Sequence, residues 1–130
     1  MDGGQAMIAL GIGLTSAVDG AAIAALVRRA LAHAGLEASV LAVPDWRADL
    51  PAVAAAARLL GLPVAPVSRA AMQTVEAAVA TRAPESLARY GVGSVAEAAA
   101  LVAAGRGARL LVARLAEAGA TCAVAEGEGP

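Results

Sequence analysis

The chain contains no phenylalanine, one tryptophan and one tyrosine, and this scarcity of large rings limits how its core can be built. Hydrophobic residues nevertheless make up 59% of its 130 residues. The core must therefore consist of Val, Leu, Ile and Ala, which suit helices packed closely on a buried sheet. A chain of this length and composition is expected to form one domain with a single core rather than a disordered segment.

Short apolar runs alternate with helical patterns along the chain. We expect strands at 6–13, 38–43, 63–67, 109–113 and 120–125, and helices at 18–33, 51–60, 69–79 and 95–104. Residues 81–93 lack periodicity and are expected to form a long loop, and the tail 126–130 is expected to fray. This order predicts a single three-layer α/β domain, residues 1–130 with a core at about 6–126, built on a mostly parallel sheet of about five strands flanked by helices. The last two strands are too close for a crossover helix and should pair antiparallel.

Capping residues mark several expected helix starts. Asp49 is expected to cap the helix that begins at Pro51, and Ser68 can cap the next helix. Ser94 and Glu97 form a capping-box pattern, in which the serine accepts a hydrogen bond from the third helical amide and the glutamate reaches back to the serine amide. The box is explained by structure alone, yet the free amides at this helix start also suit a carboxylate.

The charges and the single cysteine and histidine exclude several functions. The net charge is −1 and all ten basic residues are arginine, with no basic block, so nucleic-acid binding is not expected. Cys122 and His33 are each alone, which rules out an internal disulfide and gives no basis for a Cys/His metal site. Residues 1–5 show no leader-like pattern and the apolar run 7–10 is too short for a bilayer. We therefore expect a cytoplasmic protein without a metal and without membrane contact.

The glycine-rich end of the first expected strand is the first candidate binding segment. Gly11, Gly13, Thr15 and Ser16 lie where the strand leads into a helix. Backbone amides at such a junction form a natural cradle for an anion, and open α/β sheets bind ligands outside the carboxyl ends of their strands. The spacing differs from that of a dinucleotide-binding loop. The alternative is that the glycines only permit a tight turn.

The loop at 44–49, which follows the second expected strand, is the second candidate. Trp46 offers a flat face to a planar ligand, and Arg47 offers a planar fork that matches a carboxylate. The alternative is that Asp45 ends a turn and that Arg47 is solvated. No histidine or cysteine stands near a nucleophile in a spacing that supports a catalytic triad.

Four segments together resemble a family of cobalamin-biosynthesis proteins that includes CobE and the C-terminal domain of CbiG. They are AMIALGIG at 6–13, LAHAGLEASV at 31–40, WRADLPAVAAAARLLGLPV at 46–64 and GVGSVAEAAALVAAGRGARLLVARLAEAGATCAVA at 91–125. The last segment is the most specific. The resemblance covers about residues 7–126 and leaves no further domain, so it favours a stand-alone CobE-like form.

This resemblance implies a role in making the corrin ring of vitamin B12. The expected function is to bind or process a precorrin intermediate, with a cobalt-precorrin-5A hydrolase-like activity (lactone opening with release of acetaldehyde) as one form of processing. A non-catalytic corrinoid carrier or assembly module is the alternative. The implied partners are the corrin ligand and other corrin-pathway enzymes, no cofactor is expected, and alanine-rich helix faces favour a homodimer.

The resemblance and the two candidate segments together predict a cleft at the carboxyl ends of the strands. Arg47 and Arg114 match basic positions of the family, whereas Leu14 and Thr15 replace a Cys-Arg pair that family members often carry after the first strand. Asp45 is the candidate acid or base for lactone opening. The expected binding residues are Gly11, Gly13, Thr15, Ser16, Arg47, Ser68, Ser94 and Arg114.

Overall fold

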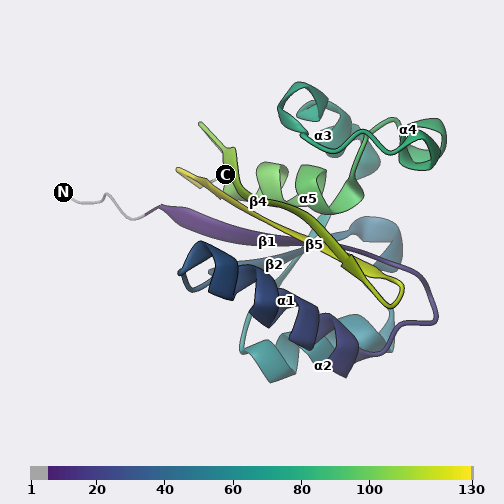
Figure 1. The fold of residues 1–130 in the computed structure, drawn as a ribbon, viewed down its shortest axis with the longest axis vertical. Coiled ribbons are helices and arrows are strands. Elements are labelled where there is room, and N and C mark those ends of the chain that lie inside the picture. The colour runs from purple at the N-terminus through teal and green to yellow at the C-terminus, as the bar shows by residue number, and fades with distance from the viewer. Residues whose placement is uncertain (1–5, 130) are drawn as a thin grey trace.

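A five-stranded sheet with the order β3-β2-β1-β5-β4 lies at the centre of the protein (Figure 1). Its strands are β1 (Met7–Leu14), β2 (Val40–Pro44), β3 (Val64–Val67), β4 (Arg109–Glu117) and β5 (Ala120–Gly127). β1, β2 and β3 pair in parallel, and β5 pairs antiparallel with both β1 and β4. Four strands therefore share one direction, which confirms the mostly parallel sheet and its antiparallel last pair.

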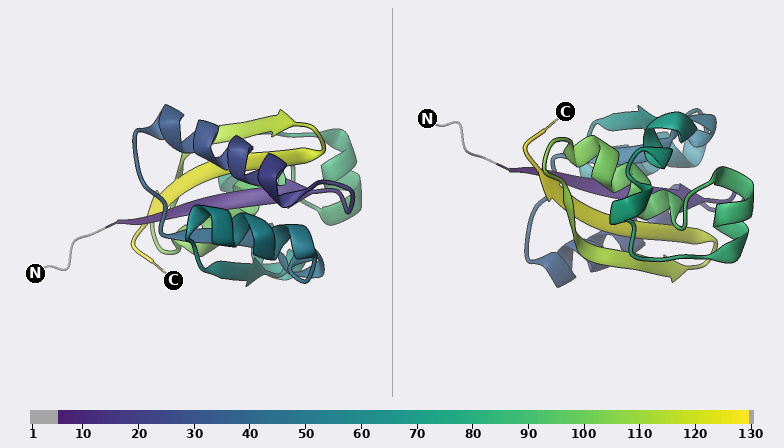
Figure 2. Two further views of the ribbon diagram at one scale, coloured as in Figure 1. Left: turned by 90° about the horizontal axis from the view of Figure 1, so that it is seen from below. Right: turned by 90° about the horizontal axis from the view of Figure 1, so that it is seen from above.

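Helices cover both faces of this sheet and complete the predicted three layers (Figure 2). They are α1 (Gly20–Ala34), α2 (Pro51–Leu60), α3 (Arg69–Gln73), α4 (Pro84–Tyr90) and α5 (Val95–Ala104). α1 and α2 lie together on one face, while α5 packs along β1 and β5 on the other, with α3 and α4 beyond it. The computed structural model describes residues 6–129, so the leader-free start predicted for residues 1–5 and the last residue, Pro130, lie outside it.

The central strand β1 divides the core into two apolar clusters. Ile8, Leu10 and Ile12 pack toward α1 and α2, whereas Ala9 packs toward the alanine-rich α5. Gly11 faces α5 so closely that a Cβ atom there would lie 1.9 Å from the carbonyl oxygen of Ala96. Small side chains thus let the backbones of α5 and β1 approach each other, which is how a core without phenylalanine fills its interior.

Three predictions about local structure were wrong between Asp49 and Gly93. Asp49 does not cap α2; Leu50 stands at that position without a side-chain bond, and Pro51 at the first turn has no amide that needs a partner. The helix predicted at 69–79 ends at Gln73, although Ser68 caps it as expected, with Oγ accepting from the amide of Ala71 at 3.1 Å. The loop predicted at 81–93 contains α4, a helix too short to show a clear period.

The predicted fraying of the tail was also wrong for the residues that the structure describes. β5 continues to Gly127, and the amide of Gly129 donates to the carbonyl oxygen of Ala104 at 2.8 Å. The amide of Arg106 donates in turn to the carbonyl oxygen of Gly129 at 3.1 Å. The tail is therefore held by backbone hydrogen bonds to the end of α5, which no composition-based argument reveals.

No single helix within residues 6–129 is long and apolar enough to cross a membrane. One pair, α4 and α5, meets the test of length and composition only when its two helices are taken together across a bend of 62°.

Candidate functional site

A cleft of about 1110 Å³ opens at the carboxyl ends of β1, β2 and β4. Its volume lies slightly above the range of roughly 300–1,000 Å³ that is usual for ligand pockets. Three parts of the chain surround it: the turn after β1 with the β4–β5 hairpin, the N-terminal end of α5, and α4. The lining residues used below are Gly13, Thr15, Trp46, Glu85, Arg89, Tyr90, Ser94, Arg114, Glu117 and Thr121.

The first side of the cleft is formed by two turns that bind each other. The β4–β5 hairpin turns at Ala118 and Gly119, with φ angles of 52° and 85°, a pair of positive values typical of a tight two-residue hairpin. The carbonyl oxygen of Gly119 accepts a hydrogen bond from the amide of Thr15 at 3.0 Å. A Cβ atom on Gly13 would lie 2.6 Å from Oγ1 of Thr121, so glycine is needed there for close packing.

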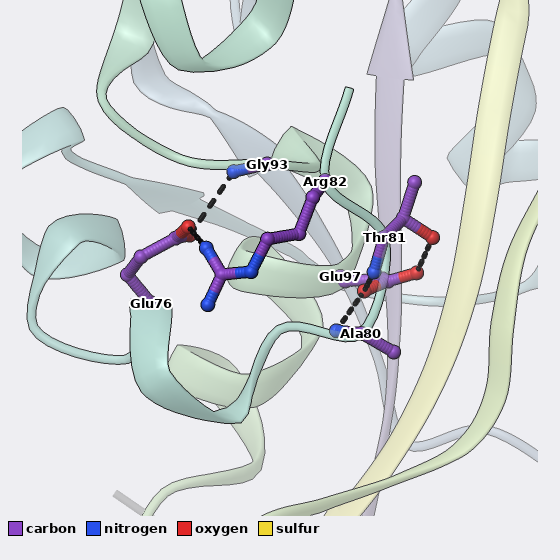
Figure 3. A network of polar contacts seen from close by, with 6 residues as sticks. All are labelled: Glu76, Ala80, Thr81, Arg82, Gly93 and Glu97. Carbon is purple, nitrogen blue, oxygen red and sulfur yellow. Dashed lines mark hydrogen bonds and ion pairs between the residues drawn. The ribbon is translucent and has the colours of Figure 1, made fainter. Parts of the chain in front are cut away.

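The N-terminal end of α5 forms the floor of the cleft. Oγ of Ser94 accepts from the amide of Glu97 at 3.1 Å, which confirms the serine half of the capping box. The glutamate half was wrong, because the Glu97 carboxylate does not return to Ser94. It accepts from the amides of Ala80 at 2.7 Å and Thr81 at 2.9 Å and from the Thr81 hydroxyl at 2.5 Å (Figure 3). It also accepts from the amide of Arg114 at 2.9 Å. This one side chain therefore joins α5 to β4 and to the segment before α4.

A bulge in β4 explains why a glutamate is needed at this point. Val112 pairs with Val124 and Leu115 with Cys122, so β4 carries one extra residue between these two pairs. The amide of Arg114 lies in this bulge and donates to Glu97 rather than to β5. Bulges redirect side chains and leave backbone groups unpaired. Here the bulge places Arg114 in the cleft lining while the buried carboxylate satisfies its amide.

Glu97 is fully buried, with 0% of the residue exposed, and lies within bonding distance of no cationic side chain among residues 6–129. Burial acts to raise the pKa of this carboxyl, but the hydrogen bonds from Thr81, Arg114 and Ala80 outweigh burial and lower the pKa below its ordinary value of 4.5. Glu97 is therefore an anion at neutral pH. Burial raises the pKa of the Cys122 thiol to about 12, so this cysteine is unreactive, as its place in an apolar strand suggested.

A second carboxylate fixes the segment that follows α4. Oε1 of Glu76 accepts from the amide of Gly93 at 3.0 Å, and Oε2 binds the guanidinium of Arg82 (Figure 3). The amide of Ala83 donates to the carbonyl oxygen of Gly93 at 3.1 Å. The two chain segments that flank α4 are thereby bound to each other.

The wall opposite the hairpin contains the only two aromatic side chains of the sequence. Trp46 and Tyr90 stack with their ring centroids 5.0 Å apart and their planes 22° apart. The guanidinium of Arg69 lies 5.9 Å from the Trp46 centroid, and that of Arg89 lies 6.0 Å from the Tyr90 centroid. This wall therefore offers flat apolar surface next to two cations.

Charges in the cleft lining include two arginines and two glutamates. Arg89 and Arg114 are exposed and form no ion pair with another residue of 6–129. Of the two acids, Glu117 is paired with Arg29 outside the cleft, whereas Glu85 is not paired within the described chain. The arginines are thus available to carboxylates of a ligand.

The structure brings together four of the predicted site residues and leaves five outside the cleft lining. Gly13, Thr15, Ser94 and Arg114 line it. The other binding candidates and Asp45 do not: Gly11 is covered by α5, Ser68 caps α3, Nε of Arg47 is buried without a hydrogen-bond partner in the described chain, and Ser16 and Asp45 are exposed. Asp45 as an acid or base stays a prediction that has no support from this geometry.

Sequence reasoning missed the contribution of α4 to the cleft. Arg89 and Tyr90 were not among the expected site residues because the region was interpreted as a loop, and Trp46 was noticed without its partner. The Pro84 start and the Gly91 end, where φ is 76°, are the usual punctuation of a short helix and were the available signal. Within residues 6–129 no group of three or more metal-binding side chains comes together.

The layers and the cleft define an open α/β domain with a cleft at the carboxyl ends of its strands, where domains of this class bind ligands. The sequence profile described as "Cobalamin synthesis G C-terminus" matches residues 8–125. The Sinorhizobium protein CobE is 37% identical over 121 residues, which cover 91% of this chain and 79% of CobE. The chain therefore belongs to the CobE/CbiG C-terminal family of cobalamin-biosynthesis proteins, as the sequence resemblance predicted.

Solved structures agree with this assignment. The crystal structure of CobE, a protein from the cobalamin (vitamin B12) biosynthetic pathway, matches with a TM-score of 0.84 and 31% identity over 93% of this chain and 90% of that one. The cobalamin biosynthesis protein chiG from Agrobacterium tumefaciens matches with a TM-score of 0.74 and 38% identity, covering 92% and 97% of the two chains. A cobalamin biosynthesis protein G homologue from Sulfolobus solfataricus shares the fold, with a TM-score of 0.70 at 22% identity over 92% of this chain and 36% of that chain.

Proposed function

We propose that the cleft binds a precursor of the corrin ring and holds it through the carboxylates on its side chains. The observation that carries this proposal is the combination of Arg89 and Arg114, both without an ion-pair partner in the described chain, with the apolar surface of Trp46 and Tyr90 in one large cleft. Corrin precursors combine a broad ring with several peripheral carboxylates. Membership of a cobalamin-biosynthesis family supports this class of ligand.

Binding or carrying is favoured over bond cleavage. The polar side-chain groups of the described cleft lining are hydroxyls, carboxylates, guanidinium groups and the indole N–H of Trp46, with neither histidine nor cysteine among them. A hydrolase needs a base within hydrogen-bond reach of the attacking water. Of the two glutamates, Glu117 is already paired with Arg29, and Glu85 is an exposed side chain in the first turn of α4. We therefore propose a corrinoid carrier that works in the cytoplasm, where a single free cysteine such as Cys122 is typical.

A titration with two stable corrins tests the binding proposal. Isothermal titration calorimetry would compare dicyanocobyrinic acid, whose side chains end in carboxylates, with dicyanocobinamide, in which these groups are amides. We expect Arg114→Gln and Arg89→Gln each to weaken binding of the acid by roughly 10- to 150-fold, since a charge-assisted hydrogen bond contributes about 1.5–3 kcal/mol. The same variants should bind the amide as the parent protein does.

The matched control is Arg58→Gln, which removes an exposed arginine from α2 on the opposite face. It should bind both corrins normally. An acid that binds equally well to all three variants would contradict the proposed role of the cleft arginines. Mass spectrometry after incubation with a lactone-bearing corrin precursor separates the two functions: an unchanged ligand mass supports a carrier, and an opened lactone with released acetaldehyde would establish a hydrolase.

A further inference from the structure

α4 is attached to the rest of the protein in an unusual way. None of its residues is buried, and it makes only sparse contacts with the other helices and strands. In Figures 1 and 2 it lies beyond α5, at the end of the molecule where the cleft opens. Helices with so little buried surface open locally at low cost in free energy. α4 nevertheless supplies most of one wall of the cleft, including Glu85, Arg89 and Tyr90.

The two ends of this wall are fixed much more firmly than its middle. On the N-terminal side, the amides of Ala80 and Thr81 are bound by the buried Glu97 carboxylate. On the C-terminal side, the amide of Gly93 is bound by Glu76. The hydrogen bond from the amide of Ala83 to the carbonyl oxygen of Gly93, at 3.1 Å, closes the base between them. A surface segment whose two ends are joined in this way, as Ala83 and Gly93 are here, can move as one unit.

Three contacts hold the C-terminal end of α4. One is the guanidinium of Arg69, which lies 5.7 Å from the Tyr90 centroid. Nε2 of Gln73 donates to the carbonyl oxygen of Tyr90 at 2.9 Å, an exposed hydrogen bond next to the base. The Tyr90 ring stacks on Trp46, which belongs to the loop after β2 and is 37% exposed. A stacked aromatic pair in this half-solvated position contributes modestly and can separate without unfolding the core.

We propose that α4 is a lid over the cleft and that the Trp46–Tyr90 stack is its latch. This inference rests on the proposed function, since it describes how the same cleft admits and releases a bulky ring. The ends of the lid at Ala83 and Gly93 stay in place while residues 84–90 swing outward. When the stack separates, the faces of the Trp46 and Tyr90 rings that covered each other are exposed. The ligand can then pack against these ring faces.

Hydrogen exchange measured by mass spectrometry tests the lid first in the absence of ligand. We expect the amides of 85–90 to exchange faster than those of α5 in the parent protein. Tyr90→Ala should accelerate exchange at 85–90 by roughly 2- to 12-fold, which corresponds to the loss of one aromatic pair, and leave α5 unchanged. Tyr90→Phe keeps the ring and should resemble the parent protein. Leu59→Ala, on α2 at the far face, is the control and should not affect 85–90.

Two results would contradict the lid: amides of 85–90 that exchange as slowly as those of α5, or a Tyr90→Ala variant in which exchange rises equally in both segments. In either case α4 would open only together with the core. A second measurement adds dicyanocobyrinic acid to the parent protein. Binding that changes the exchange of 85–90 supports the lid, and binding without such a change contradicts it. If no corrin binds, the proposed function fails and the ligand-free comparison alone decides whether α4 is a lid.

Discussion

The floor and the wall of the cleft are held in place by different kinds of contact, buried hydrogen bonds in one and exposed contacts in the other. The floor, formed by the start of α5 and the bulge of β4, is centred on the buried anion Glu97, whose four hydrogen bonds come from two separate segments, residues 80–81 and the bulge at Arg114. The wall, formed by α4, buries none of its own residues, and its C-terminal end is held by the Trp46–Tyr90 stack, the Arg69 guanidinium and the Gln73–Tyr90 hydrogen bond. Both border the same space, yet their expected contributions to the free energy of unfolding differ severalfold.

This difference shows how a small domain can combine a fixed site with access to it. A buried carboxylate is costly to leave unsatisfied, so Glu97 defines a single arrangement of the segments that it joins. An exposed aromatic pair imposes no such penalty when it separates. The floor therefore keeps Arg114 in position, while the wall that carries Arg89 remains free to move.

The largest effect is expected from removing the charge at the floor. Glu97→Gln replaces a carboxylate oxygen by an amide that points hydrogen atoms at existing donors, so some of the four hydrogen bonds are lost in a buried site. We expect the free energy of unfolding to fall by about 4 kcal/mol, measured by urea denaturation. Glu37→Gln, at an exposed position after α1, is the matched control and should change it by less than about 0.5 kcal/mol. If the two variants lost equal amounts of free energy of unfolding, Glu97 would not stabilise the floor of the cleft more than an exposed glutamate does.

The next largest effect concerns the contact between α5 and β1, which supports the same floor. Gly11→Ala places a Cβ atom 1.9 Å from the carbonyl oxygen of Ala96 and 2.6 Å from the amide nitrogen of Ala100. The backbones must separate, and we expect a loss of about 3 kcal/mol in thermal or urea unfolding. Gly35→Ala, whose Cβ meets nothing within 4 Å but whose φ is 68°, should cost about 1 kcal/mol. A fully stable Gly11→Ala protein that binds corrin poorly would instead make Gly11 a binding residue.

The charge on Glu97 also predicts how stability depends on pH. Its pKa in the folded protein is lower than its ordinary value of 4.5, so the unfolded chain binds more protons between these two values. The stabilisation is complete above the unfolded pKa and is lost as the pH falls through the folded one. Urea unfolding at several pH values from about 6 to 3 should show stability falling with pH in the parent protein, and less steeply in Glu97→Gln. Parallel pH profiles of the two proteins would show that the carboxylate is not the group responsible.

The smallest effect on the free energy of unfolding is expected at Glu76, which binds the segment that follows α4. Glu76→Gln weakens the bond to the amide of Gly93 and the ion pair with Arg82. We expect about 1 kcal/mol of lost stability and faster hydrogen exchange at 84–93. Arg82→Gln removes only the exposed ion pair and should cost less than about 0.5 kcal/mol. A larger loss from Arg82→Gln than from Glu76→Gln would mean that the ion pair, rather than the backbone bond, fixes this end of α4.

Local patterns along the sequence were sufficient to predict the sheet and the end of the sheet where the cleft opens. Apolar runs, glycine-terminated helices and the short link between β4 and β5 all follow from neighbouring residues. The hydrogen bonds of the Glu97 carboxylate were not predictable in this way. Their donors lie in residues distant from Glu97 in the sequence, and one of these, the amide of Arg114, belongs to a bulge. Asp49 illustrates the opposite error, since a common capping residue stood one position too early and Leu50 took its place.

The candidate site was predictable where it follows strands and where Ser94 caps α5. Gly13, Thr15 and Arg114 lie at or near the ends of β1 and β4, where ligands of open sheets bind, whereas Arg89 and Tyr90 belong to a helix too short for periodicity to reveal. The stack of Trp46 on Tyr90 joins the segment after β2 to the end of α4, two parts of the chain that are remote in sequence. Such a pairing is a property of the tertiary structure.

The most direct test of the account is a crystal structure of the protein with bound dicyanocobyrinic acid. We predict that the ring lies in the cleft, with its carboxylates at Arg114 and Arg89, α4 displaced or the Trp46–Tyr90 stack separated, and the bonds of Glu97 unchanged. A corrin bound instead at the second, shallower groove beside Arg28 and Leu36, on the α1 face, would contradict the account.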